Sequence, residues 1–182
     1  STLAKLNKNI SSAGSELGQL SKDERALQNL IDELQSAVSD IPIDLPKGKK
    51  FSKLKGKLPW PVKGRYLAQF GQKKTQGKLK WRGVWLAAPA GASVRVIADG
   101  RVAYVGWMHR YGLIVVVEHG EKYFSLYGHN ETAKVKVGQW VEAGDVISTA
   151  GNTGGHSKTG AYLEIRKAKT PINPKTWLRP KS

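Results

Sequence analysis

Residues 93–129 read SVRVIADGRVAYVGWMHRYGLIVVVEHGEKYFSLYGH, and this stretch decides the fold. Short runs of β-branched and aromatic residues alternate in it with turns that contain glycine. The turns are Asp99-Gly100, Tyr111-Gly112 and His119-Gly120. Runs of this kind, repeated at intervals of about ten residues, are typical of antiparallel strands joined by short loops. The stretch therefore predicts a mainly β, antiparallel domain.

The same texture extends through residues 58–182. We expect strands at Val94–Ala98, Arg101–Val105, Leu113–His119, Tyr123–Tyr127, Val135–Val137, Val146–Ala150 and Tyr162–Ile165. A chain of 182 residues with 40% hydrophobic content can form one packed domain and an appendage. We assign the β domain to residues 58–182.

Residues 1–41 have a different pattern, with apolar residues spaced three and four apart. This spacing predicts helices, and Ser21-Lys22-Asp23-Glu24 has the form of a capping box, so we expect a second helix to begin at Ser21. The apolar stripe of this helix needs a cover, either a partner helix or the following domain. The stripe consists of Leu27, Leu30, Ile31 and Leu34.

Residues 42–57 read PIDLPKGKKFSKLKGK, with two prolines and many lysines. Such a composition predicts a basic linker whose lysines face solvent. The chain therefore divides into a helical arm at 1–41, a linker at 42–57 and the β domain.

The composition limits the chemistry that the chain can perform. It has no cysteine and only four histidines, so a metal would need histidine and carboxylate ligands. The net charge of +16 indicates an anionic partner such as nucleic acid, acidic lipid or bacterial cell wall. No apolar run approaches the roughly 20 residues of a membrane span, so we expect no membrane insertion.

Residues 80–89 read KWRGVWLAAP, which places Trp81 and Trp85 beside Lys80 and Arg82. Later blocks read YGLIVVVEHG, SLYGHN, VKVGQWVEAGDVI, GNTGG and AYLEIR. In this order, the blocks resemble the lysostaphin/LytM-type metallopeptidase domain from about Leu58 to Leu178. The resemblance implies an antiparallel β-sheet fold.

Active members of that family hold zinc with an HxxxD motif and the second histidine of an HxH motif. Three ligands leave the fourth zinc position open for a catalytic water. Here, HxxxD falls on residues 81–85 and HxH on residues 160–162, so Trp81, Trp85 and Tyr162 stand at the ligand positions. Only the histidine of a Y-x-H segment remains, as His129. We therefore expect no metal, no cofactor and no catalytic residues.

A helical arm before a LytM-type domain without zinc ligands, with KLKGKLPWPVKG at the junction and NPKTWL near the end, resembles the EnvC family of cell-division amidase activators. The resemblance implies a periplasmic protein at the division septum of a Gram-negative bacterium. It implies activation of an N-acetylmuramoyl-L-alanine amidase and recruitment by the FtsE–FtsX complex. That contact uses a coiled coil that is mostly absent from this sequence.

The resemblance also implies a groove across the sheet that binds the amidase, with the helical arm folded over it. The groove residues are Arg82, Trp85, Tyr111, Tyr127, His129, Tyr162 and Arg166. Trp, Tyr and Arg are the residues that protein interface centres favour. Along residues 162–166, period-2 alternation places Tyr162 and Glu164 on one face and Leu163 and Ile165 on the other.

Three rival functions stay open at this point. They are an active wall hydrolase, a peptidoglycan-binding module that uses the positive charge, and a nucleic-acid binder. The last is disfavoured because the sequence has no recognised nucleic-acid module. For the helical arm, ordinary coiled-coil pairing is the alternative to masking of the groove.

Overall fold

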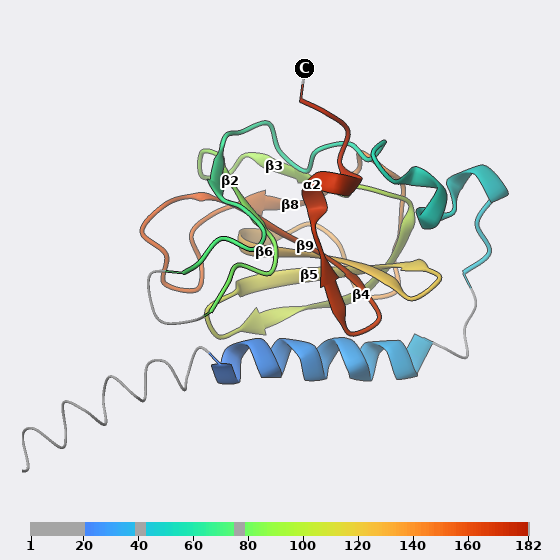
Figure 1. Cartoon of the computed structure of the whole chain (residues 1–182), viewed down its shortest axis with the longest axis horizontal. Coiled ribbons are helices and arrows are strands. Elements are labelled where there is room, and N and C mark those ends of the chain that lie inside the picture. Colours follow the sequence, from blue (N-terminus) through green and yellow to red (C-terminus); the bar gives the residue numbers. More distant parts are fainter. Residues whose placement is uncertain (1–20, 39–42, 75–78, 182) are drawn as a thin grey trace, which may run out of the picture.

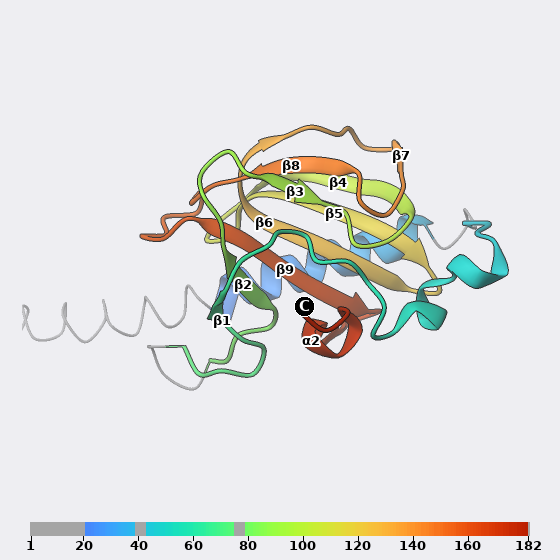
Figure 2. The same cartoon turned by 90° about the horizontal axis from the view of Figure 1, so that it is seen from above.

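The structure, a computed structural model, describes residues 21–38, 43–74 and 79–181. A single antiparallel sheet dominates it (Figure 1), with the strand order β1-β2-β9-β6-β5-β4-β7 (Figure 2). β10 pairs with β9, and β8 pairs with both β6 and β3. The strands are β1 (Tyr66–Ala68), β2 (Val84–Ala87), β3 (Ser93–Arg95), β4 (Gly100–Met108), β5 (Gly112–Gly120), β6 (Tyr123–Ala133), β7 (Trp140–Val141), β8 (Val146–Ala150), β9 (Gly160–Lys167) and β10 (Thr170–Ile172). The mainly β, antiparallel prediction is confirmed.

Residues 100–133 form the meander of β4, β5 and β6. Between β5 and β6, Glu121 and Lys122 both have positive φ, at 54° and 68°, as a two-residue hairpin turn of type I′ requires. The predicted strand Val146–Ala150 is confirmed as β8. The predicted strand Val135–Val137 is wrong, because these residues form a loop that turns at Gly138 (φ 91°) before β7.

One face of the sheet packs against the segments before β1 and after β10. Two short 3-10 helices, η1 (Lys47–Lys49) and η2 (Phe51–Leu54), lie in the segment that we expected to be a linker. Phe51 is fully buried there, with its ring 4.9 Å from those of His119 and Trp177. The core therefore extends beyond the boundary predicted at residue 58. The chain ends near a short helix, α2 (Pro174–Trp177).

A helix at residues 21–38 covers the opposite face of the sheet, and both views show it lying along that face (Figures 1 and 2). Leu27 and Ile31 are completely buried in a cluster with side chains of β2, β5, β6 and β9. The predicted helix is thus confirmed over these residues. The predicted start of this helix at Ser21 directly follows residues 1–20, which lie outside the described residues. The first helix predicted within residues 1–41 also lies outside them. No helix in the described ranges is long and apolar enough to cross a membrane.

Candidate functional site

Trp81, Trp85 and Tyr162, which stand where active members of the resembled family carry zinc ligands, lie close together under the helix. Trp85 on β2 lies opposite Tyr162 on β9, and the ring of Trp81 is 5.8 Å from that of Trp85 and 6.0 Å from that of Tyr162. Trp85 is 9% exposed and Tyr162 is 3% exposed. The three side chains therefore form an aromatic cluster where the resemblance implied a metal centre.

A metal ion does not fit this cluster. Indole side chains offer no lone pair for a metal, and the Tyr162 hydroxyl donates a 2.7 Å hydrogen bond to Glu164. A side chain at Gly160, the other HxH position, would place its Cβ 2.2 Å from the carbonyl oxygen of Leu86. Within the described residues, no group of three or more His, Asp or Glu side chains could hold a metal ion.

His129 lies at the end of the aromatic cluster, where β6 leaves its regular conformation. Its backbone has a φ of 62°, and its N–H donates a 2.7 Å hydrogen bond to the Tyr111 carbonyl. The ring Nδ1 is 3.2 Å from the same carbonyl oxygen and 3.1 Å from that of Thr153. Because carbonyls only accept, Nδ1 carries the proton and Nε2 is an acceptor. This Nε2 atom is buried and has no hydrogen-bond partner in the described parts of the chain.

A second imidazole packs against His129, with its plane tilted by 48°. The ring centroids of His129 and His156 are 3.8 Å apart, and His156 Nε2 donates to the Arg110 carbonyl over 2.6 Å. Burial, followed by the neighbouring His156, lowers the pKa of His129 to about 3. Burial also lowers the pKa of His156. Both rings are therefore neutral at pH 7.

A buried ion pair continues the site along β9. Arg166 donates from Nε and Nη2 to Glu164 Oε1, each over 2.8 Å, and Glu164 is fully buried. Burial and the charge of Glu164 raise the pKa of Tyr162 well above its ordinary value, so the phenol stays protonated. Arg166 Nη1 also donates to the side-chain oxygen of Gln28 over 2.6 Å, which joins the ion pair to the helix.

The helix covers the site with an apolar stripe and fastens its first turn with charges. Leu27 and Ile31 are the buried residues of the stripe, and Leu30 and Leu34 are partly buried beside them. Asp23 lies 2.9 Å from His109 Nδ1. Glu24 lies 3.5 Å from Lys74 Nζ and 3.8 Å from Arg82 Nε. Partly exposed pairs of this kind contribute about 0–1 kcal/mol each, so the stripe supplies most of the docking energy.

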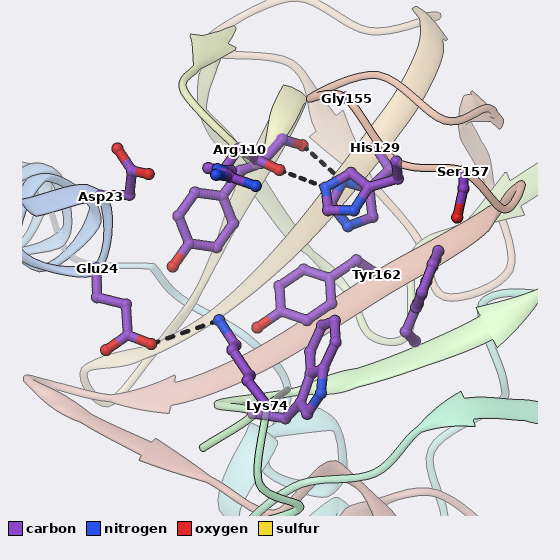
Figure 3. Close-up of a pocket in the computed structure, with 12 residues that line it drawn as sticks. Asp23, Glu24, Lys74, Arg110, His129, Gly155, Ser157 and Tyr162 are labelled. Carbon is purple, nitrogen blue, oxygen red and sulfur yellow. Dashed lines mark hydrogen bonds and ion pairs between the residues drawn. The ribbon is translucent and has the colours of Figure 1, made fainter. Parts of the chain in front are cut away.

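A cavity of about 360 Å³ remains between the first helical turn and the sheet (Figure 3). The helix contributes Asp23 and Glu24, and the sheet side contributes His129 and Tyr162. The rest of the wall includes Lys74, Trp81, Trp85, Arg110, Tyr111 and His156. A volume of this size lies within the usual range for small-molecule pockets.

The structure gathers most of the predicted groove residues, with one correction. Trp85, Tyr111, His129 and Tyr162 line the cavity, Arg82 lies at its edge in the pair with Glu24, and Arg166 lies further along beneath Gln28.

Placing Tyr127 in the groove was wrong. It pairs with Leu163 on the other face, and its hydroxyl accepts a 3.0 Å hydrogen bond from the Ile97 N–H. The family resemblance had implied that Tyr127 shares the groove with His129, but the positive φ of His129, two residues later, interrupts the strand and puts the two side chains on different faces.

Several residues of the site were not found from the sequence. His156, Arg110 and Lys74 come from loops, and loop residues have no periodicity that fixes a face. Gln28 could have been suspected, because it adjoins Leu27 in the helical stripe. The sequence had no signal for its bond to Arg166.

Comparison with known proteins places this geometry in a family. Residues 79–174 match the model of peptidase family M23. The chain is 44% identical over 124 residues to the murein hydrolase activator EnvC of Escherichia coli K12, which covers 68% of this chain and 29% of that protein. It is 37% identical over 120 residues to the murein hydrolase activator NlpD of the same organism, covering 65% and 30%. The chain thus spans about three tenths of these relatives' length.

Solved structures share the fold. The structure superposes on a zinc-containing peptidase from Vibrio cholerae with a TM-score of 0.63 and 27% identity, covering 69% of this chain and 41% of that one. The catalytic domain of lysostaphin from Staphylococcus simulans, at 21% identity and a TM-score of 0.57, shows the same fold over 61% of this chain and 89% of that one.

Proposed function

Because the chain belongs to peptidase family M23, we propose that it is a non-catalytic member that activates a cell-wall amidase. The observation that carries the proposal is the aromatic cluster of Trp81, Trp85 and Tyr162 at the expected ligand positions. An aromatic groove with fixed positive charge suits a protein partner better than hydrolysis. The names of the relatives EnvC and NlpD, murein hydrolase activators, support the same role.

The target that we propose is an N-acetylmuramoyl-L-alanine amidase in the periplasm, at the division septum of a Gram-negative bacterium. These enzymes cut the amide between the glycan strand and the stem peptide, which lets daughter cells separate. Escherichia coli, the source of both relatives, is Gram-negative. Recruitment by the FtsE–FtsX complex would use a coiled coil upstream of most of this chain.

The helix at residues 21–38 is the regulatory element in this proposal. It buries Leu27 and Ile31 on the face that also carries Trp85 and Tyr162, so helix and partner compete for one surface. This competition sets the apparent affinity for the partner. If the partner binds only chains in which the helix has left the groove, its apparent affinity falls in proportion to the fraction of chains that are open. In the open form, the groove captures the amidase segment that blocks the enzyme's own zinc site and shifts the enzyme towards its active state.

The test measures release of dye-labelled peptidoglycan by a purified amidase mixed with the full chain. A Leu27→Asp/Ile31→Asp variant places two charges under the helix and should open it, raising stimulation several-fold over the unmodified chain. The matched control, Ala26→Asp/Asn29→Asp, adds the same charge on the exposed side of the helix and should behave like the unmodified chain.

Two outcomes would contradict separate parts of the proposal. If neither the unmodified chain nor the opened variant stimulates the amidase, the chain is not an activator. If both stimulate equally, the helix does not mask the groove. In the opened background, Trp81→Ala should remove most of the stimulation, whereas Trp107→Ala, at a residue 61% exposed on β4, should leave it unchanged.

Binding to peptidoglycan is a second candidate function, favoured by the net charge of +16. Stem peptides of the wall carry carboxylates, and attraction to them weakens as salt screens the charges. Co-sedimentation of the chain with purified wall sacculi, repeated at rising salt, tests this function. Binding that does not change with salt would contradict a charge-driven interaction.

A further inference from the structure

His129, which lines the cavity beneath the helix, has a ring nitrogen that the fold leaves unsatisfied. His129 is 2% exposed, its Nδ1 proton is used by backbone carbonyls, and its Nε2 has no partner within the described residues. Leaving a buried acceptor unpaired costs about 1–3 kcal/mol, so such an atom calls for an explanation. A ligand that offers an N–H or O–H group would satisfy it.

The walls beside this acceptor are flat and apolar. Trp81 and Trp85 are nearly parallel, with 22° between their planes, and the rings of Tyr111 and Tyr162 lie 6.0 Å apart. These four side chains line the cavity together with the imidazoles of His129 and His156. Surfaces of this kind bind small aliphatic groups by removing them from water.

Two cationic side chains line the cavity, along with the carboxylates of Asp23 and Glu24. Arg110 and Lys74 both line it, and their charges both help to lower the pKa of His156. Lys74 pairs with Glu24, while Arg110 has no ion pair among the described residues. A guanidinium group in this position suits a carboxylate, which it can bind with two parallel hydrogen bonds.

We propose that the cavity binds the carboxyl-terminal end of an acylated amino acid or short peptide. The carboxylate would lie against Arg110, the amide N–H would donate to His129 Nε2, and a small side chain would contact Trp81 and Trp85. Because the cavity exists with the helix docked, this binding does not depend on the proposed activation of an amidase.

Two sources supply this chemistry. Peptidoglycan stem peptides end in D-amino acids, whereas protein chains end in L-amino acids. The two therefore share the carboxylate and the amide N–H and differ in the direction of the side chain, which the tryptophan walls would distinguish.

The test titrates three probes into the ¹⁵N-labelled full chain and follows the indole N–H signals by NMR. The probes are N-acetyl-D-alanyl-D-alanine, its L,L isomer and the D,D dipeptide with its carboxylate converted to an amide. We expect saturable shifts of the Trp81 and Trp85 signals with an acid probe, and at least about tenfold weaker binding of the amide. Tighter D,D binding assigns the site to wall peptides, tighter L,L binding assigns it to protein ends, and equal binding supports the shared chemistry.

Two variants test the named contacts. His129→Asn removes the Nε2 acceptor with a residue that tolerates positive φ, and should weaken the acid probe about tenfold. Arg110→Asn removes the charge at a position with φ 72°, and should also reduce the salt dependence of binding. The matched control is Lys122→Asn, which loses the same charge at a φ of 68° in a distant turn and should bind normally.

The inference is overturned if neither acid probe shifts the two indole signals, if the amide binds as tightly as the acid, or if a folded His129→Asn variant binds unchanged. The comparison of acid with amide uses the unmodified chain, so it stands even if a variant fails to fold. A chain that binds no probe but still stimulates the amidase overturns this inference alone.

Discussion

Trp85 on β2 and Tyr162 on β9 are directly opposite each other in the sheet, so both side chains project beneath the same helix. The pair joins two segments that are far apart in the sequence at the positions where the resemblance implied metal ligands. Both residues are buried, and Tyr162 is tied to Glu164 by its hydroxyl. Aromatic packing and hydrogen bonds therefore occupy the space that a metal centre would need.

A histidine at position 160 cannot be accommodated next to this pair. Gly160→His should lower the free energy of unfolding by more than about 2 kcal/mol, because its Cβ would meet the Leu86 carbonyl oxygen at 2.2 Å in the paired strand. Urea unfolding measures the change. The matched control, Gly48→His, introduces the same side chain where no atom lies within 4 Å and should stay within about 0.5 kcal/mol of the unmodified chain. A fully stable Gly160→His variant would contradict the packing described for β2 and β9.

The ion pair between Glu164 and Arg166 should be sensitive to the loss of one partner. Arg166→Met leaves the fully buried Glu164 without its cation, and breaking such a pair typically costs about 3–5 kcal/mol. Equilibrium unfolding in urea is again the measurement. Lys49→Met removes the cation of a pair with Asp99 in which the lysine is 57% exposed, and should cost less than about 1 kcal/mol. Equal losses in the two variants would contradict the contrast in burial.

The sequence predicted the sheet well because strand patterns are local. Regular turns and β-branched runs located β4, β5, β6, β8 and β9, and two-residue alternation correctly separated Tyr162 from Leu163. The failures come from events that are not local. In a regular strand, Tyr127 and His129 would share one face, and the positive φ of His129, which the sequence did not reveal, puts them on opposite faces.

Long-range packing explains the other omissions. Phe51 lies in a lysine-rich segment, yet its ring inserts between His119 and Trp177, which only the folded chain brings together. His156 reaches His129 through a loop, and Gln28 reaches Arg166 across the helix–sheet interface. A residue's own neighbours in the sequence cannot indicate contacts of this range.

His119 should make the stability of the chain depend on pH. Burial lowers its pKa from 6.5 to about 4, so between these values the unfolded chain binds a proton that the folded chain does not. The free energy of unfolding should therefore be highest above pH 6.5 and should fall by about 3 kcal/mol as the pH decreases towards 4. Unfolding free energies measured from pH 7.5 to pH 4.5 should show this decline.

Two variants isolate the contribution of His119. His119→Gln removes the titrating group and should flatten the decline by about 1.4 kcal/mol per pH unit in the acid range, even if the variant is less stable overall. Ile147→Val, at a fully buried position that carries no titrating group, should leave the slope unchanged. An unaltered slope in His119→Gln would mean that other groups cause the acid sensitivity.

The docked helix should respond to the loss of a few methyl groups at its centre. Ile31 is fully buried against the sheet. Ile31→Ala should therefore weaken the docking of the helix on the sheet by about 2–4 kcal/mol. Because the helix can leave without unfolding the sheet, the loss should appear as local opening. Hydrogen exchange of the amides at residues 27–34 should accelerate on the order of 100-fold, while the amides of β5 stay protected.

The same variant links stability to the proposed function. If the helix competes with the amidase for the groove, Ile31→Ala should raise the population of open chains and tighten apparent binding by a similar factor, up to the intrinsic affinity of the open groove. Asn29→Ala, at an exposed position of the same turn, should change neither exchange nor binding. Faster exchange with unchanged amidase binding would show that the helix moves but does not control the groove, because competition requires both quantities to shift together.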